Sequence, residues 1–163
     1  MKLKTLTLTA AFVAGMFTSA HANDPKATIA DLDARLAKIG APKIDGEDKV
    51  ADKAVPALYF GERKVNNNYD VVDAVRKTHT ATATIFVKTG DEFVRVSTNV
   101  LTPEGKRGIG TQLARNKAYE ALSKGEPFCG PIDVLGTAFD ACYNPIKDTA
   151  GKIIGASYIG HKK

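Results

Sequence analysis

The sequence predicts an α+β domain in which helices pack on an antiparallel β-sheet. Three observations predict this fold class: segments with the apolar spacing of helices, five runs rich in β-branched and aromatic residues, and turn-forming residues between those runs. The chain has 163 residues, of which 44% are apolar and 25% charged. This composition is typical of one globular domain and excludes a disordered or collagen-like chain.

The first predicted helix covers residues 25–40. Asp24 is a favourable N-cap, Pro25 suits the first helical position, and Gly40 and Pro42 end the pattern. One apolar stripe runs along this helix, formed by Ile29, Leu32, Leu36 and Ile39. The stripe is explained equally by packing on the sheet of the same chain and by a homodimer through this helix.

The next segments alternate between irregular structure, helix and strand. Residues 41–68 are rich in Pro, Gly, Asn and Lys and are expected to be irregular, apart from the apolar patch at 55–60. A short helix is expected at 70–77, followed by strands at 80–88 and 93–101. Thr89-Gly90-Asp91 between these strands predicts a hairpin.

A helix at 111–124 and three further strands complete the pattern. Gly125 and Pro127 end the helix, and the strands are expected at 128–134, 139–146 and 152–160. Residues 148–151 supply the last turn.

The first 22 residues have the outline of a secretory signal peptide, which leaves residues 23–163 as the mature domain. Lys2 and Lys4 precede an apolar stretch at 6–17, and Ala20-His21-Ala22 forms a small-x-small cleavage site. An uncleaved anchor is the alternative, although the apolar stretch is short for a membrane span. We therefore expect a periplasmic protein with no membrane insertion after cleavage of the leader.

The charge of the mature chain argues against nucleic-acid binding. Loss of Lys2 and Lys4 lowers the basic count from 23 to 21 against 18 acidic residues, so the net charge falls from +5 to +3. The basic residues are scattered, and no phosphate-tracking stripe is present.

Cys129 and Cys142 are expected to form a disulfide in an oxidising compartment. Their spacing suits the two arms of one hairpin centred near Leu135-Gly136, with two free buried thiols as the alternative. No metal or cofactor is expected, because only His79 and His161 remain as mature histidines and no Cys-x-x-Cys-His motif for haem is present.

Several linked motifs follow one another in the second half of the chain. They are Ala83-Thr84-Ile85-Phe86, residues 91–100, Gly105-Lys106-Arg107, Gly110-Thr111, residues 125–130, Val134-Leu135-Gly136, residues 143–148 and residues 151–155. In this order they resemble the extracytoplasmic Cache sensor domains of chemoreceptors and sensor kinases. The chain resembles the single-Cache family over residues 55–160. The resemblance implies a PAS-like five-stranded sheet, with a long N-terminal helix on one face and a small-molecule pocket on the other.

The resemblance also implies a ligand class and a partner. Single-Cache domains bind small carboxylates such as pyruvate, acetate and propionate. In chemoreceptors, transmembrane and signalling helices flank the domain, whereas this chain has a cleavable leader and ends three residues after Gly160. We therefore expect a separate membrane-bound chemoreceptor or histidine kinase to read the ligand-bound form.

Arg95 is the first candidate for binding a carboxylate. Pairing of the first hairpin about Gly90 predicts one mixed face, made of Ala83, Ile85, Val87, Phe93, Arg95, Ser97 and Asn99. A guanidinium in mid-strand beside Phe93 and Ser97 needs water or an anion, and a carboxylate can accept two of its hydrogen bonds. A solvated or intramolecularly paired arginine is the alternative.

Four other residues complete the predicted site. Tyr143 could close the pocket with its hydroxyl, or could be a core residue. Ser97 and Ala83 would leave space for only a few heavy atoms beside Arg95. Thr84 and Lys147 are secondary candidates that also fit a sheet surface or a turn.

An enzyme is not expected, because His79 has no evident acidic residue to orient it and no paired nucleophile. The glycines at 105, 108 and 110 lack the lysine-serine or lysine-threonine ending of a phosphate loop. A structural or adaptor protein of the cell envelope without a ligand would fit the same fold and remains the alternative.

Overall fold

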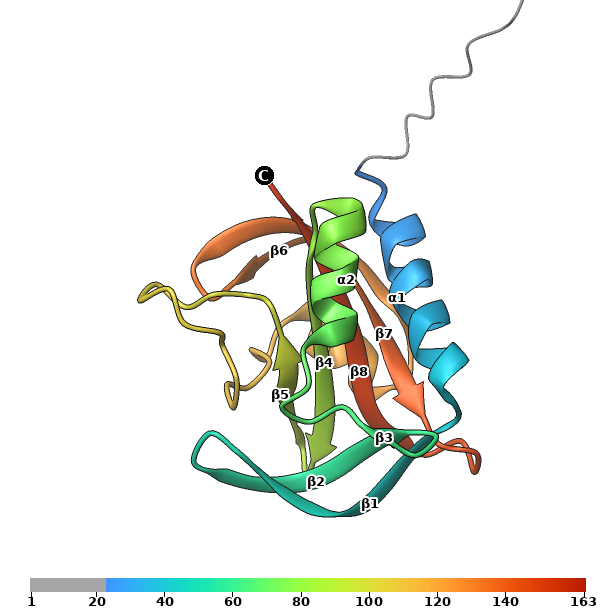
Figure 1. Ribbon diagram of the computed structural model, residues 1–163. Helices are drawn as coiled ribbons and strands as arrows, with labels where there is room; N and C mark the ends of the chain where they lie inside the picture. Colours follow the sequence, from blue (N-terminus) through green and yellow to red (C-terminus); the bar gives the residue numbers. More distant parts are fainter. Residues whose placement is uncertain (1–22) are drawn as a thin grey trace, which may run out of the picture.

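The computed structural model describes residues 23–163 (Figure 1). The predicted signal peptide lies outside the described residues. Five strands form one antiparallel sheet in the order β5-β4-β8-β7-β6. Their bounds are β4 Thr82–Thr89, β5 Glu92–Thr98, β6 Phe128–Val134, β7 Thr137–Lys147 and β8 Ile153–Lys162. In chain order this is the sequence 2-1-5-4-3, so the predicted PAS-like five-stranded sheet is confirmed.

Helix α1 (Pro25–Ile39) lies across one face of the sheet, over β7 and β8 (Figure 1). The carboxylate of Asp24 accepts a hydrogen bond from the backbone N–H of Lys26, as expected of an N-cap. The stripe packs on the sheet of the same chain, since Ile29, Leu32 and Leu36 are at most 4% exposed. The stripe is therefore explained without a second copy, and the homodimer stays a prediction.

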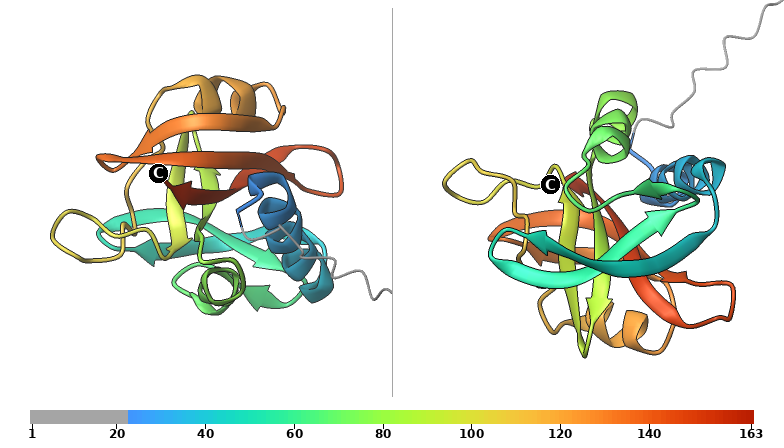
Figure 2. Two further views of the ribbon diagram at one scale, coloured as in Figure 1. Left: turned by 90° about the horizontal axis from the view of Figure 1, so that it is seen from above. Right: turned by 60° about the horizontal axis from the view of Figure 1, so that its bottom comes forward.

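Two further elements cover the same face as α1: helix α2 (Asp70–His79) and a small sheet of β1 (Pro42–Val50), β2 (Lys53–Phe60) and β3 (Arg63–Lys64). Figure 2 shows these elements on one side of the main sheet and α3 (Lys117–Ser123) on the other. Together with α1 they enclose the first of two apolar cores, which contains Leu32, Leu58, Val75, Ile85 and Ile159.

The expectation of irregular structure at 41–68 is wrong for most of that segment. Strand β1 is largely exposed and carries Asp45, Glu47 and Asp48, so its sequence lacks the alternation of a half-buried strand. Its pairing with β2, from Pro42 opposite Phe60 to Val50 opposite Lys53, holds it in place instead.

The opposite face of the main sheet is covered by α3 and the loop before it. The predicted helix at 111–124 is shorter than expected, since α3 begins after Asn116, whose side chain caps the N–H groups of Ala118 and Tyr119. Residues 110–113 instead run along β5, where Leu113 N–H donates to the carbonyl of Phe93. The free edge of β5 offers these backbone partners, which outweigh a weak helical pattern.

The predicted disulfide between Cys129 and Cys142 is confirmed. The two residues lie opposite each other in the β6–β7 hairpin, which turns at Leu135-Gly136 as expected. The S–S distance is 1.99 Å. No helix within residues 23–163 is both long enough and apolar enough to span a bilayer.

Candidate functional site

The face on which Arg95 lies is set by the turn of the first hairpin. Thr89 pairs with Glu92, so the loop contains two residues, and Phe86 pairs with Arg95. The predicted centre at Gly90 is therefore wrong by half a residue, which moves Phe93 and Arg95 to the other face. Arg95 lies with Phe86 and not with Ile85 and Val87.

A β-bulge then separates Ser97 from Arg95. The register shifts between Ile85 and Phe86, so that Ile85 lies opposite Ser97 and one extra residue, Val96, is accommodated in β5. Ser97 is fully buried on the face of α1, where its hydroxyl donates to the carbonyl of Asn68. The structure thus does not bring Ser97 to the guanidinium of Arg95.

Arg95 is buried without an acidic partner. The residue is only 3% exposed to solvent. Its guanidinium forms no ion pair within residues 23–163. One terminal nitrogen, Nη1, donates to Thr111 Oγ1 at 3.0 Å and to the carbonyl of Gln112 at 2.9 Å. The buried Nε has no partner within the described residues. A donor of a charged group is therefore left unsatisfied in the interior.

The surroundings of Arg95 are aromatic. Its guanidinium carbon stands 5.0 Å from the centre of the Phe86 ring, and the Phe86 and Tyr143 rings are 6.5 Å apart. Burial lowers the pKa of Arg95. The ordinary pKa of arginine is so high that the side chain still carries its charge at neutral pH.

Tyr143 and Tyr158 lie opposite each other on β7 and β8, with ring centres 4.8 Å apart. Burial raises the pKa of both hydroxyls well above the ordinary value, while the charge of Arg95 acts to lower both. Both tyrosines are therefore neutral hydrogen-bond donors within the electrostatic reach of the guanidinium. The hydroxyl of Tyr158 is 3.0 Å from Thr82 Oγ1.

The two secondary candidates lie in different places. Thr84 is fully buried on the face of Phe86, and its hydroxyl is 2.6 Å from that of Thr98. Lys147 is exposed at the end of β7, where it lines a surface pocket with Asp33 and Leu36 of α1. Thr84 thus shares the face of Arg95, and Lys147 does not.

A pocket of about 350 Å³ opens at the end of the aromatic face. Thr82, Val134 and Phe139 are among its lining residues, and Thr82 connects it to the Tyr158 hydroxyl. Val134 and Phe139 also belong to the second apolar core, together with Phe86, Tyr143 and Tyr158. Arg95 and Tyr143 do not line this pocket but lie deeper in the same layer.

Sequence reasoning missed Tyr158 and Phe86 as neighbours of Arg95. Tyr158 could have been found by pairing β7 with β8 about the predicted turn at 148–151, because this places Tyr143 and Tyr158 on one face. Phe86 required the correct hairpin centre. The contacts from Thr111 and Gln112 had no signal, because the sequence of their segment predicts a helix.

The five-stranded antiparallel sheet with helices on both faces defines a PAS-like fold. Residues 17–163 match the family described as the Cache 3/Cache 2 fusion domain, and the chain belongs to that family. No curated protein matches the chain. Family membership makes the protein an extracytoplasmic sensory ligand-binding module, and such domains are sensory rather than catalytic.

Proposed function

We propose that the protein binds a small carboxylate such as pyruvate, acetate or propionate at Arg95 and presents it to a membrane-bound chemoreceptor or histidine kinase. The observation that carries this proposal is the buried guanidinium of Arg95. Within residues 23–163 its Nε has no hydrogen-bond partner, and the guanidinium forms no ion pair. A carboxylate would supply the missing negative charge and accept a hydrogen bond from Nε.

The neighbouring groups suit the two ends of such a ligand. The neutral hydroxyl of Tyr143 can donate to the carboxylate, and Phe86 offers an apolar surface to a short carbon chain. The tight packing of Tyr143 against Tyr158 limits the ligand to a few heavy atoms. Contact of Thr84 with the ligand is part of this proposal, because Thr84 lies on the same face as Arg95. Ser97 and Lys147 lie on other surfaces, so we expect neither to contact a ligand bound at Arg95.

We expect the ligand to enter through the pocket lined by Thr82 and Phe139. This expectation is supported by Thr82, whose Oγ1 is 3.0 Å from the Tyr158 hydroxyl. A rotation of the Tyr158 ring would connect this pocket to the guanidinium, so we expect binding to be accompanied by a side-chain rearrangement.

Location and assembly belong to the same proposal. A periplasmic site, reached after cleavage at residue 22, would allow the protein to sample extracellular acids and fits the extracytoplasmic family. A homodimer through α1 would need the exposed side of the helix, because the apolar stripe is already buried in its own chain.

One observation favours a second candidate, the ligand-free structural or adaptor protein. Nη1 of Arg95 already has two partners in Thr111 and Gln112, which hold the loop over the sheet. In that case the arginine would be a structural anchor for the loop.

A melting-temperature screen separates the two candidates. It uses two- to four-carbon carboxylic acids, with the corresponding neutral amides as matched controls. A ligand at a hundredfold excess over its Kd stabilises the native state by about 2.7 kcal/mol, which corresponds to roughly 8 °C for a domain of this size. We expect a shift with at least one acid and none with its amide. Equal responses to acid and amide, or no response to any acid, would favour the adaptor.

A further inference from the structure

The disulfide lies between an open pocket and the first apolar core, to which Cys142 belongs. Cys129 is exposed on β6, an edge strand of the sheet, whereas Cys142 on β7 is fully buried. Both residues line a pocket of about 440 Å³, whose other walls are the start of α1 and the end of β8. The two sulfurs therefore differ in access, and an incoming reagent meets Cys129 first.

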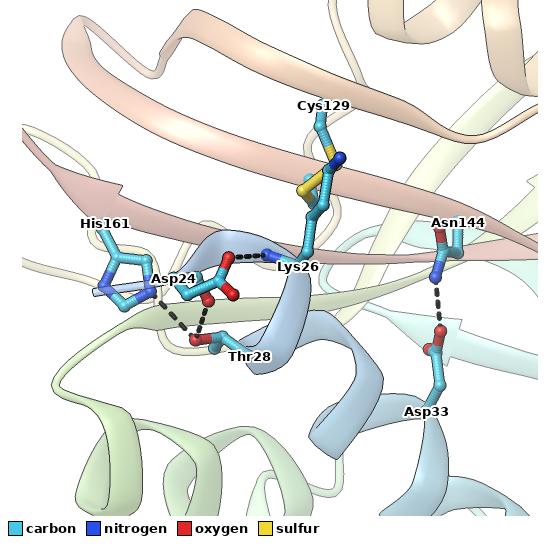
Figure 3. The surroundings of a disulfide bond; sticks show 8 residues. Asp24, Lys26, Thr28, Asp33, Cys129, Asn144 and His161 are labelled. Carbon is cyan, nitrogen blue, oxygen red and sulfur yellow. Dashed lines mark hydrogen bonds between the residues drawn. A yellow bond between two sulfur atoms is a disulfide. The ribbon is translucent and has the colours of Figure 1, made fainter. Parts of the chain in front are cut away.

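The charges around the pocket favour sulfur in its anionic form. Lys26 in the first turn of α1 lines the pocket, and Figure 3 shows its ammonium end directed toward the disulfide. Lys162 adds a second cation, and the N-terminus of α1 adds the positive end of a helix dipole. These groups lower the free energy of a thiolate beside them.

Two acidic residues and a histidine also face the pocket. Asp24 is engaged as the N-cap of α1, and Asp140 pairs with Lys163 at 3.1 Å. His161 is held by Thr28, whose Oγ1 is 3.0 Å from His161 Nε2 (Figure 3). Asp140 is thus paired, whereas Asp24 keeps its charge and offsets part of the effect of the two lysines. The ammonium of Lys26 forms no ion pair within the described residues.

We propose that the Cys129–Cys142 disulfide is a thiol–disulfide exchange site of the native protein, with Cys129 as the sulfur that is attacked. The partner is a dithiol. Its thiolate forms a bond to Cys129 Sγ, the Sγ–Sγ bond breaks, and the electron pair leaves on Cys142 Sγ. The second thiol of the partner then displaces Cys129. The protein gains two electrons and two protons, and the partner becomes a disulfide. This inference does not depend on carboxylate binding.

Reduced glutathione is a suitable probe, because its attack gives a mixed disulfide that is preserved when N-ethylmaleimide blocks the released protein thiol and the excess glutathione. The folded protein is incubated with glutathione, free thiols are trapped with N-ethylmaleimide, and the two cysteines are mapped by mass spectrometry. We expect glutathione on Cys129 and the trap on Cys142. The rate should rise linearly with glutathione and stay constant at low urea concentrations, as native-state access requires.

Lys26→Gln tests the role of the pocket, with Lys38→Gln in the last turn of the same helix as the control of equal charge change. We expect the first variant to slow exchange about fivefold and the second to leave the rate unchanged. Glutathione on Cys142, exchange that accelerates with urea in step with unfolding, or equal effects of the two variants would each overturn the proposal.

Discussion

Phe86 lies directly opposite Arg95 across the β4–β5 pair, and the guanidinium carbon of Arg95 stands 5.0 Å from the centre of the Phe86 ring. The ring offers its negative face to the cation, which recovers part of the hydration that Arg95 loses on burial. It offers no acceptor to Nε, which has no partner within residues 23–163. The Phe86 ring thus stabilises the buried charge of Arg95, while the Nε–H group stays able to donate a hydrogen bond to an anion.

Replacement of Gly155 by alanine should destabilise the centre of the sheet. Gly155 lies in β8 opposite Val87, and a Cβ there would collide with the backbone carbonyl oxygen of Phe86. The strands would have to separate, so we expect a loss of about 3 kcal/mol in the free energy of unfolding, measured by urea titration.

Gly130→Ala is the matched control for Gly155→Ala. Its Cβ would lie 3.3 Å from Cζ of Phe128, a side chain that can move, on the edge strand β6. We expect a change within about 1 kcal/mol. Equal losses in the free energy of unfolding in the two variants would show that the close approach of Gly155 to the Phe86 backbone does not cause the destabilisation.

Removal of the disulfide should weaken both the fold and the proposed site. The Cys129→Ser/Cys142→Ser variant loses a cross-link that closes a short loop, which costs about 2–3 kcal/mol in the free energy of unfolding. The neighbouring pair in the ladder is Phe128 and Tyr143, whose rings are 6.3 Å apart. We therefore expect weaker carboxylate binding as well, by calorimetry. Unchanged affinity would mean that the hairpin holds Tyr143 without the cross-link.

Stability should fall between pH 7.5 and pH 5.5 because of His161. Burial lowers the pKa of His161 below its ordinary value of 6.5, and the nearby His79 lowers it further. Asp24 and Asp140 act in the opposite direction but do not reverse the shift. The unfolded chain therefore binds a proton more readily than the native state, so stability is lost as the pH falls through 6.5.

The urea midpoint of unfolding measures this pH dependence. His161→Gln removes the titrating group, and we expect its midpoint to vary less between pH 7.5 and pH 5.5 than that of the wild type. A variant with the same pH dependence as the wild type would exclude His161 as the cause.

Ser97→Ala and Tyr143→Phe should separate stability from binding. Ser97→Ala leaves the partly buried carbonyl of Asn68 without the hydroxyl donor, so we expect a loss of about 1 kcal/mol in stability and unchanged carboxylate affinity. Tyr143→Phe removes only a hydroxyl, and we expect roughly tenfold weaker binding with little change in melting temperature. Weakened binding in Ser97→Ala would return Ser97 to the site.

The position assigned to a hairpin turn decides which side chains the sequence predicts to lie together. Cys129 and Cys142 are related by the two-residue turn at Leu135-Gly136, so their pairing follows from its position. The face of Arg95 depends on a hairpin centre that moved by half a residue. Such a small error changes every side-chain direction in a strand.

Other features were hidden because tertiary contacts override the local pattern. Strand β1 carries too many charges to show alternation and exists through its pairing with β2. Gln112 pairs with Val94 along the edge of β5, although its own segment has helical spacing. The β-bulge at Val96 places Ser97 on the face opposite to Arg95, and no residue pattern in the sequence predicts this bulge.

Calorimetric titration of the protein with acetate, propionate and pyruvate tests the role of Arg95 most directly. It compares the wild type with Arg95→Met, which keeps the volume but removes the charge, and with Arg115→Met. Arg115 provides the control because it also stacks on an aromatic ring, that of Tyr119 at 5.0 Å, but is exposed. We predict saturable binding of at least one acid to the wild type and to Arg115→Met, and a loss of at least about a hundredfold in affinity in Arg95→Met. Full affinity in a folded Arg95→Met variant would contradict the proposed role of Arg95.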